Sequence, residues 1–87
     1  MELNYYLKAH GFSRCNKHIL QKQSFKCGCF FCTSIYSPDR IKEWIKDEDN
    51  DTAICPYCGI DAVIGDFSVY PIEKEFLEDM KKFWFKM

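Results

Sequence analysis

Cys29-Phe30-Phe31-Cys32 and Cys55-Pro56-Tyr57-Cys58 are the two stretches that decide the fold of this 87-residue chain. A Cys-x-x-Cys turn directs two sulfurs toward one point, and two such turns can complete a tetrahedron around one ion. The 22 residues between them come close to the spacing of four-cysteine zinc sites, and Gly59 suits the tight turn that follows a knuckle. The sequence therefore predicts one structural Zn²⁺ ion bound by Cys29, Cys32, Cys55 and Cys58.

Two further cysteines, Cys15 and Cys27, lie outside these pairs. Cys27 and Cys32 could chelate in a different register, but the two-residue spacer between Cys29 and Cys32 makes the standard knuckle, so Cys29 is preferred. The sequence leaves open whether Cys27 replaces it. The cysteines that do not bind metal are expected to be reduced and partly buried, where a thiol packs as a small apolar group.

The start of the chain bears on whether these cysteines are thiols or disulfides. Residues 1–8 contain no basic segment followed by an apolar run, which a secretory signal would have. No apolar run elsewhere approaches the roughly 20 residues that cross a membrane. We therefore expect a cytoplasmic protein with reduced cysteines and no membrane partner, a setting in which paired cysteines usually bind metal.

The pattern of apolar residues predicts one α+β domain over residues 1–87. Residues 1–26 are expected to form one or two short helices, with Asn16 as a candidate helix cap. Residues 27–87 are expected to form a zinc-ribbon-like core. In this core each knuckle lies on short antiparallel strands, because β-branched and aromatic residues flank both cysteine pairs.

Two further helices are predicted within this core. Ser37-Pro38 is a typical helix start and predicts an inserted helix near residues 38–47, with one apolar stripe formed by Ile41, Trp44 and Ile45. Pro71 precedes a longer amphipathic pattern, which predicts a C-terminal helix near residues 72–85 packed across the knuckles.

Charge is distributed unevenly and limits the choice of partner. Residues 1–27 carry five basic side chains against one acidic one, whereas residues 28–66 carry three against eight. Four thiolates around Zn²⁺ would make the second segment more acidic by two charges, and it would repel a polyanion. We therefore expect a non-catalytic module that binds another protein, as a small regulatory, inhibitory or immunity-type factor. A nucleic-acid-binding zinc ribbon that uses Lys17, Lys22 and Lys26 is the alternative.

Phe30, Phe31 and Tyr57 are the candidate partner contacts. They lie at the tips of the knuckles, which project from a zinc ribbon, and an acidic loop at residues 47–51 would lie beside them. An exposed apolar patch with a charged rim is typical of a protein interface. The alternative is that the rings shield the sulfurs or pack on the C-terminal helix.

Catalysis is not expected. A zinc ion with four cysteine ligands has no open position for a catalytic water, and His10 and His18 are expected to be exposed or satisfied histidines. Cys55-Pro56-Tyr57-Cys58 resembles the active site of glutaredoxins, so a thiol redox protein is a further alternative. Such a site needs a helix after its first cysteine, whereas the β-like residues 60–64 follow here.

A longer pattern surrounds the cysteines. It consists of Cys27 to Cys32, Ile41 to Trp44, Thr52 to Gly65, Pro71-Ile72, Phe76-Leu77, Met80 and Trp84-Phe85. Together these segments resemble an uncharacterised family of small bacterial cytoplasmic proteins over about residues 16–86. The resemblance implies a bacterial, cytoplasmic zinc-binding protein and no established activity. Val69 stands where a glycine is expected, so a turn with positive φ is not predicted at residues 68–71.

Overall fold

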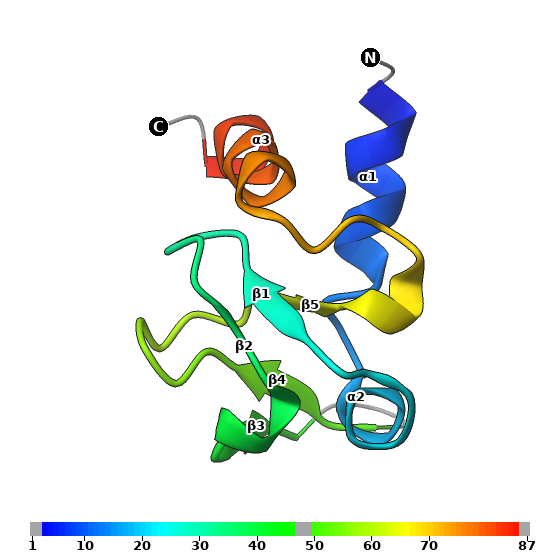
Figure 1. Ribbon diagram of the computed structural model, residues 1–87, viewed down its shortest axis with the longest axis vertical. Helices are drawn as coiled ribbons and strands as arrows, with labels where there is room; N and C mark the ends of the chain where they lie inside the picture. Colours follow the sequence, from blue (N-terminus) through cyan, green and yellow to red (C-terminus); the bar gives the residue numbers. More distant parts are fainter. Residues whose placement is uncertain (1–2, 47–49, 86–87) are drawn as a thin grey trace.

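The computed structural model describes residues 3–46 and 50–85, and its five short strands form two antiparallel sheets. In the first sheet the central strand pairs with one strand on each side (Figure 1). The second sheet has two strands. The strands are β1 (Cys27–Cys29) between β2 (Ile35–Tyr36) and β5 (Val63–Gly65), and β3 (Glu43–Ile45) with β4 (Thr52–Ile54). The predicted α+β class with short antiparallel strands is confirmed.

Helices α1 (Leu3–Gly11) and α3 (Lys74–Phe85) lie together on one side of the three-stranded sheet (Figure 1). The Trp84 indole N–H donates to the Tyr6 carbonyl oxygen at 3.2 Å, which ties the two helices together. The predicted C-terminal helix is confirmed, although it begins at Lys74. None of the described helices is both long and apolar enough to span a lipid bilayer.

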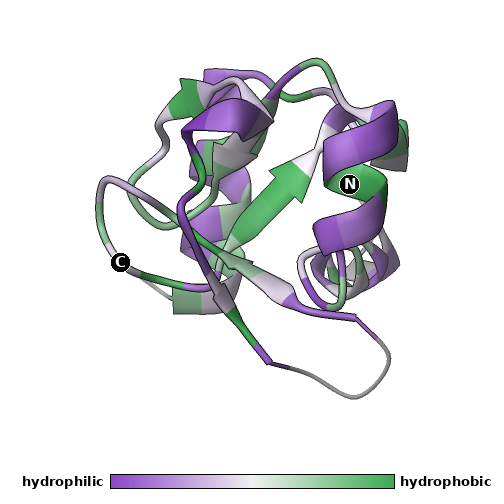
Figure 2. Ribbon diagram, turned by 90° about the horizontal axis from the view of Figure 1, so that it is seen from below, coloured by the Kyte–Doolittle hydropathy of each residue, from purple (hydrophilic) through white to green (hydrophobic). Residues whose placement is uncertain are grey.

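Helix α2 (Lys17–Gln23) lies at the opposite end of the molecule, beside the two-stranded sheet (Figure 1). Its outward turns are hydrophilic (Figure 2), while Leu20 is fully buried. The predicted helical segment at the N-terminus is therefore two helices separated by a short turn.

Asn16 occupies the position before α2, but its side chain does not cap the helix. The amide nitrogen donates to the Phe12 and Val63 carbonyl oxygens at 3.1 and 3.0 Å, and the amide oxygen accepts from the Ala53 N–H at 3.1 Å. Asn16 is buried and joins β4 of one sheet to β5 of the other. The predicted capping role is wrong, because backbone groups of Phe12, Val63 and Ala53 take up the side chain instead.

The predicted inserted helix at residues 38–47 is wrong. Ser37 does accept from the Asp39 N–H, but the helical turn ends after residues 38–40, and Ile41 is extended. Residues 43–45 then form β3, with Trp44 opposite Ala53. A short apolar run fits a helix or a strand equally well, so pairing with β4 decides its structure. Ile45 is 45% exposed, which a buried helical stripe would not allow.

The strands on either side of the second knuckle belong to different sheets. The sequence predicts that each knuckle lies on short antiparallel strands, so the two sides of the second knuckle are expected to pair with each other. Instead β4 pairs with β3, and β5 begins at Val63 and pairs with β1. The second knuckle therefore links the two sheets.

Residues 47–49 of the predicted acidic loop lie outside the described part of the chain. Asp51, at the end of this loop, has a carboxylate oxygen 3.9 Å from the Lys17 ammonium.

Val69 has a φ of 61° and a ψ of 5°, which is the left-handed region. The expectation that this turn avoids positive φ is wrong. The Val69 N–H donates to the Asp66 carbonyl oxygen at 3.2 Å, and the side chain is 93% exposed. Turn geometry thus imposes a conformation that a β-branched side chain disfavours, and no packing contact compensates for it.

We expect Val69→Gly to raise the free energy of unfolding by about 0.5–1 kcal/mol, because relief of left-handed strain exceeds the added entropy of glycine. Denaturant-induced unfolding of metal-loaded protein measures the change. Val69→Ala keeps the Cβ atom and should gain less. A glycine variant no more stable than the parent would show that the turn carries no strain.

Candidate metal centre

The four sulfurs of the two knuckles lie together. The Sγ atoms of Cys29, Cys32, Cys55 and Cys58 are all within 4.8 Å of one another. The Cys29 and Cys58 sulfurs are 3.6 Å apart, and those of Cys32 and Cys55 are 3.7 Å apart. A disulfide requires about 2.05 Å, so these are four free cysteines. The cluster could hold a metal ion.

Both knuckles use the same backbone turn. The carbonyl oxygen of the first cysteine accepts from the residue four positions on, at 2.8 Å from the Thr33 nitrogen and 2.9 Å from the Gly59 nitrogen. Thr33 and Gly59 have φ values of 63° and 78°. The sequence indicated this turn at Gly59 only, because threonine rarely adopts positive φ and so gives no signal.

The two sheets bring the knuckles face to face. Cys29 ends β1, opposite Val63 of β5, so the central sheet fixes its position. Cys55 directly follows β4 of the other sheet. The Asn16 side chain bonds to both β4 and β5, so it holds the two-stranded sheet, which precedes Cys55, against the three-stranded sheet, which carries Cys29.

Burial opposes a free thiolate at two of the four cysteines. Burial raises the pKa of Cys29, although its sulfur accepts from the Phe31 N–H at 3.4 Å, and burial also raises the pKa of Cys58. Burial acts in the same direction on Cys32, but hydrogen bonds with Ser34 and with the Cys55 and Cys29 thiols together outweigh it and lower that pKa to about 7. Oriented N–H and hydroxyl groups thus prepare the site for thiolates, and a cation would supply the remaining stabilisation.

Cys27 and Cys15 lie outside the cluster. Cys27 is fully buried, and its thiol donates to the Tyr36 carbonyl oxygen at 3.5 Å. Burial is the main reason that its pKa rises to about 12. The backbone N–H of Cys15 donates to the Thr52 hydroxyl at 2.8 Å. The structure therefore gathers Cys29, rather than Cys27, with the other three cysteines.

Tyr36 is a residue of this site that sequence reasoning missed. It pairs with Cys27 across the sheet, which directs its side chain to the face that carries Cys27 and Cys29. The ring lies 5.2 Å from that of Tyr57 in the second knuckle. Its hydroxyl is buried and forms no hydrogen bond with the described residues. Burial, followed by the neighbouring Cys55, raises the Tyr36 pKa.

The three candidate partner contacts occupy different environments. Phe30 is 1% exposed, and the centre of its ring lies 5.9 Å from that of His10 and 6.1 Å from that of Phe85. Phe31 is partly buried, with its ring 4.8 Å from Phe85. Tyr57 is 59% exposed. The rings of the first knuckle thus pack on α3, and Tyr57 alone of the three is largely open to solvent.

The lysines of the nucleic-acid alternative also differ. The Lys17 ammonium lies near the Asp51 carboxylate and 5.4 Å from the centre of the Trp44 ring, so it is already engaged. Lys22 and Lys26 are exposed. His18 is exposed, whereas His10 is half-buried with its ring 4.2 Å from that of Trp84, and burial lowers its pKa.

Comparison of the chain with protein-family models, with curated proteins and with solved structures gives no match. Fold and site therefore define its class. It is a small α+β protein in which two antiparallel sheets present a four-cysteine cluster able to bind a metal ion, consistent with a zinc-ribbon-like arrangement of knuckles.

Proposed function

We propose that the cluster is a structural Zn²⁺ site in a non-catalytic module that binds another protein. The sulfur geometry carries the first half of this proposal. Four sulfurs at about 2.3 Å from a tetrahedral zinc ion lie about 3.8 Å apart. The two inter-knuckle distances, 3.6 and 3.7 Å, are close to that value. Four cysteine ligands leave no position for a water or a substrate, which supports a structural role.

The ion would supply the positive charge that holds four thiolates in a largely buried site. The chain contributes ligand orientation through the two matching turns and the N–H groups that point at sulfur. The Tyr36 hydroxyl also fits this site. A buried donor without a partner is costly, and a Cys55 thiolate would be its charged acceptor.

We expect Tyr36→Phe to weaken zinc binding about tenfold, since loss of a hydrogen bond to a ligand commonly has an effect of that size. Competition with a chromophoric chelator gives the affinity, and the sulfur-to-metal absorption bands of the Co²⁺ form should shift. Tyr57→Phe is the matched control, because it removes the hydroxyl of the adjacent, exposed ring. Equal zinc affinity and identical Co²⁺ spectra in the two variants would assign the Tyr36 hydroxyl no role at the metal.

Three observations support a protein partner over the alternatives. A zinc-thiolate cluster adds negative charge to an acidic segment, and Lys17 is engaged with Asp51, which disfavours a phosphate backbone. After Cys55 the chain makes a turn rather than a helix, so the helix dipole that activates a redox cysteine is lacking there. Tyr57 is an exposed aromatic residue, of the kind enriched in protein interfaces.

Affinity purification with zinc-loaded protein tests this function. We expect a protein recovered at a fixed ratio after nuclease treatment, and a weaker complex with Tyr57→Ser. Phe25→Ser is the matched control, because Phe25 is also strongly exposed but lies outside the knuckles. Recovery of nucleic acid alone, with binding that weakens steeply with salt and after neutralisation of Lys22 and Lys26, would favour the nucleic-acid alternative instead.

A further inference from the structure

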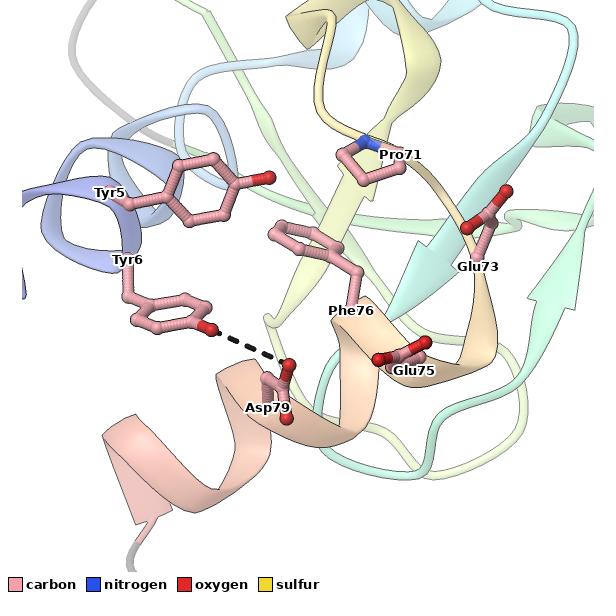
Figure 3. Close-up of a pocket in the computed structure, with 7 residues that line it drawn as sticks. All are labelled: Tyr5, Tyr6, Pro71, Glu73, Glu75, Phe76 and Asp79. Carbon is pink, nitrogen blue, oxygen red and sulfur yellow. Dashed lines mark hydrogen bonds between the residues drawn. The ribbon is translucent and has the colours of Figure 1, made fainter. Parts of the chain in front are cut away.

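A hollow of about 150 Å³ opens between α1 and α3. Ligand pockets for drug-sized molecules measure about 300–1,000 Å³, so this hollow has room for one side-chain head group. Figure 3 shows that α1 contributes two tyrosines and α3 contributes a phenylalanine and two acidic residues, while the segment before α3 adds Glu73 and Pro71. It is separate from the cysteine cluster in its residues and in its chemistry.

Aromatic rings form the wall of the hollow. The Tyr5 ring meets those of Tyr6 and Phe76 edge to face, at 5.2 and 6.0 Å between centroids. Phe76 is buried, while both tyrosines are partly exposed. Aromatic faces carry partial negative charge and attract cations, so this wall favours a flat positive group over an aliphatic one.

Three carboxylates surround the same space. Glu73 and Glu75 are exposed, and Asp79 accepts from the Tyr6 hydroxyl at 3.4 Å (Figure 3). Within the described ranges, none of the three forms an ion pair with a basic side chain. The negative potential also acts on Tyr6, whose pKa is raised by burial and then by the Asp79 and Glu75 carboxylates. A cation in the hollow would therefore meet carboxylates that form no ion pair within the described ranges.

We propose that this hollow binds an arginine side chain of the partner protein. A guanidinium group is planar, stacks on aromatic rings and pairs with carboxylates through several N–H groups, whereas a lysine ammonium is compact and more strongly hydrated. Charge complementarity excludes an acidic or phosphorylated segment. The inference rests on the proposed function, in that it assigns the contact chemistry of a protein that binds another protein.

Titration of zinc-loaded, isotope-labelled full chain with N-acetyl-arginine amide tests the inference by NMR. We expect saturable shift changes at Tyr5, Tyr6 and Phe76. N-acetyl-citrulline amide has nearly the same shape but no charge, and it should bind at least tenfold more weakly. Equal responses to the two probes, or changes confined to other parts of the molecule, would overturn the proposal.

Charge-removal variants locate the site. We expect the double substitution Glu73→Gln and Glu75→Gln to weaken capped-arginine binding at least fivefold. The matched control, Glu43→Gln with Glu78→Gln, removes two charges from exposed residues that do not line the hollow, and should bind as the parent does. Equal losses of capped-arginine affinity in the two double variants would show that the effect depends on net charge alone. That result would overturn the proposed site.

The outcomes separate this inference from the proposed function. Zinc-loaded protein that recovers a partner, yet does not respond to capped arginine, overturns the inference alone. Protein without bound metal and without a recovered protein partner overturns the proposed function, whatever the result with arginine.

Discussion

Removal of the metal is expected to abolish cooperative folding of this protein. Binding of structural zinc supplies roughly 10–16 kcal/mol in zinc-finger peptides, whereas a folded domain is typically stable by only about 5–15 kcal/mol. The two knuckles join two small sheets of two and three strands, and burial disfavours free thiolates at Cys29. Without a cation, the sheets are held together by Asn16 and by the one small apolar core that they share, and such a core alone rarely stabilises a domain of this size.

Metal content by native mass spectrometry and thermal unfolding with and without a chelator measure this effect. We expect one zinc ion per chain, and loss of the folding transition when it is removed. Cys55→Ser should lose zinc, whereas Cys15→Ser, at a half-buried position outside the cluster, should retain one ion and a nearly unchanged melting temperature. An unchanged transition after verified metal removal would contradict the structural role.

Leu77→Ala is expected to lower the free energy of unfolding by about 3 kcal/mol, in the range seen for leucines in tight cores. Leu77 lies on α3, is fully buried and faces Gly28 of β1. A Cβ atom on Gly28 would lie 2.7 Å from the Leu77 Cδ1 atom, so the leucine fills the space that the glycine leaves. Since Gly28 has no side chain to move into the cavity, the site cannot collapse easily.

Denaturant-induced unfolding of zinc-loaded variants measures this loss. Phe25→Ala is the control for an exposed ring and should change stability by less than about 0.5 kcal/mol. Gly28→Ala alone should cost about 1–3 kcal/mol through overpacking. In the Leu77→Ala background the same change should cost less, because the added methyl group enters the cavity. Strict additivity, or a loss below 1 kcal/mol for Leu77→Ala, would contradict the packing argument.

The features predicted from the sequence are those that local signals specify. Two Cys-x-x-Cys turns with a suitable separation indicate which four sulfurs meet. The C-terminal helix follows from a long apolar periodicity, which no short strand can imitate. The sequence leaves open whether the Phe30 and Phe31 rings are exposed or pack against this helix. Their exposure depends on the distant residue Phe85.

The features that the sequence did not predict depend on distant partners. Residues 43–45 become a strand only because β4 pairs with them. The Asn16 side chain bonds to backbone groups of β4 and β5 instead of capping α2. Tyr36 belongs to the metal centre through strand register, which a single sequence does not reveal. Turns impose a positive φ on Thr33 and Val69. Threonine and valine rarely adopt this conformation, so the sequence gives no sign of these turns.

The contact between α1 and α3 has a consequence for folding during synthesis. Tyr6 and Trp84, which bond to each other, are 78 positions apart, whereas the Cys29 and Cys58 sulfurs are separated by only 29. All four cysteines therefore leave the ribosome before any residue of α3 does. The metal site can thus form from residues that emerge first, whereas the Trp84–Tyr6 bond that ties α1 to α3 forms only after α3 has emerged.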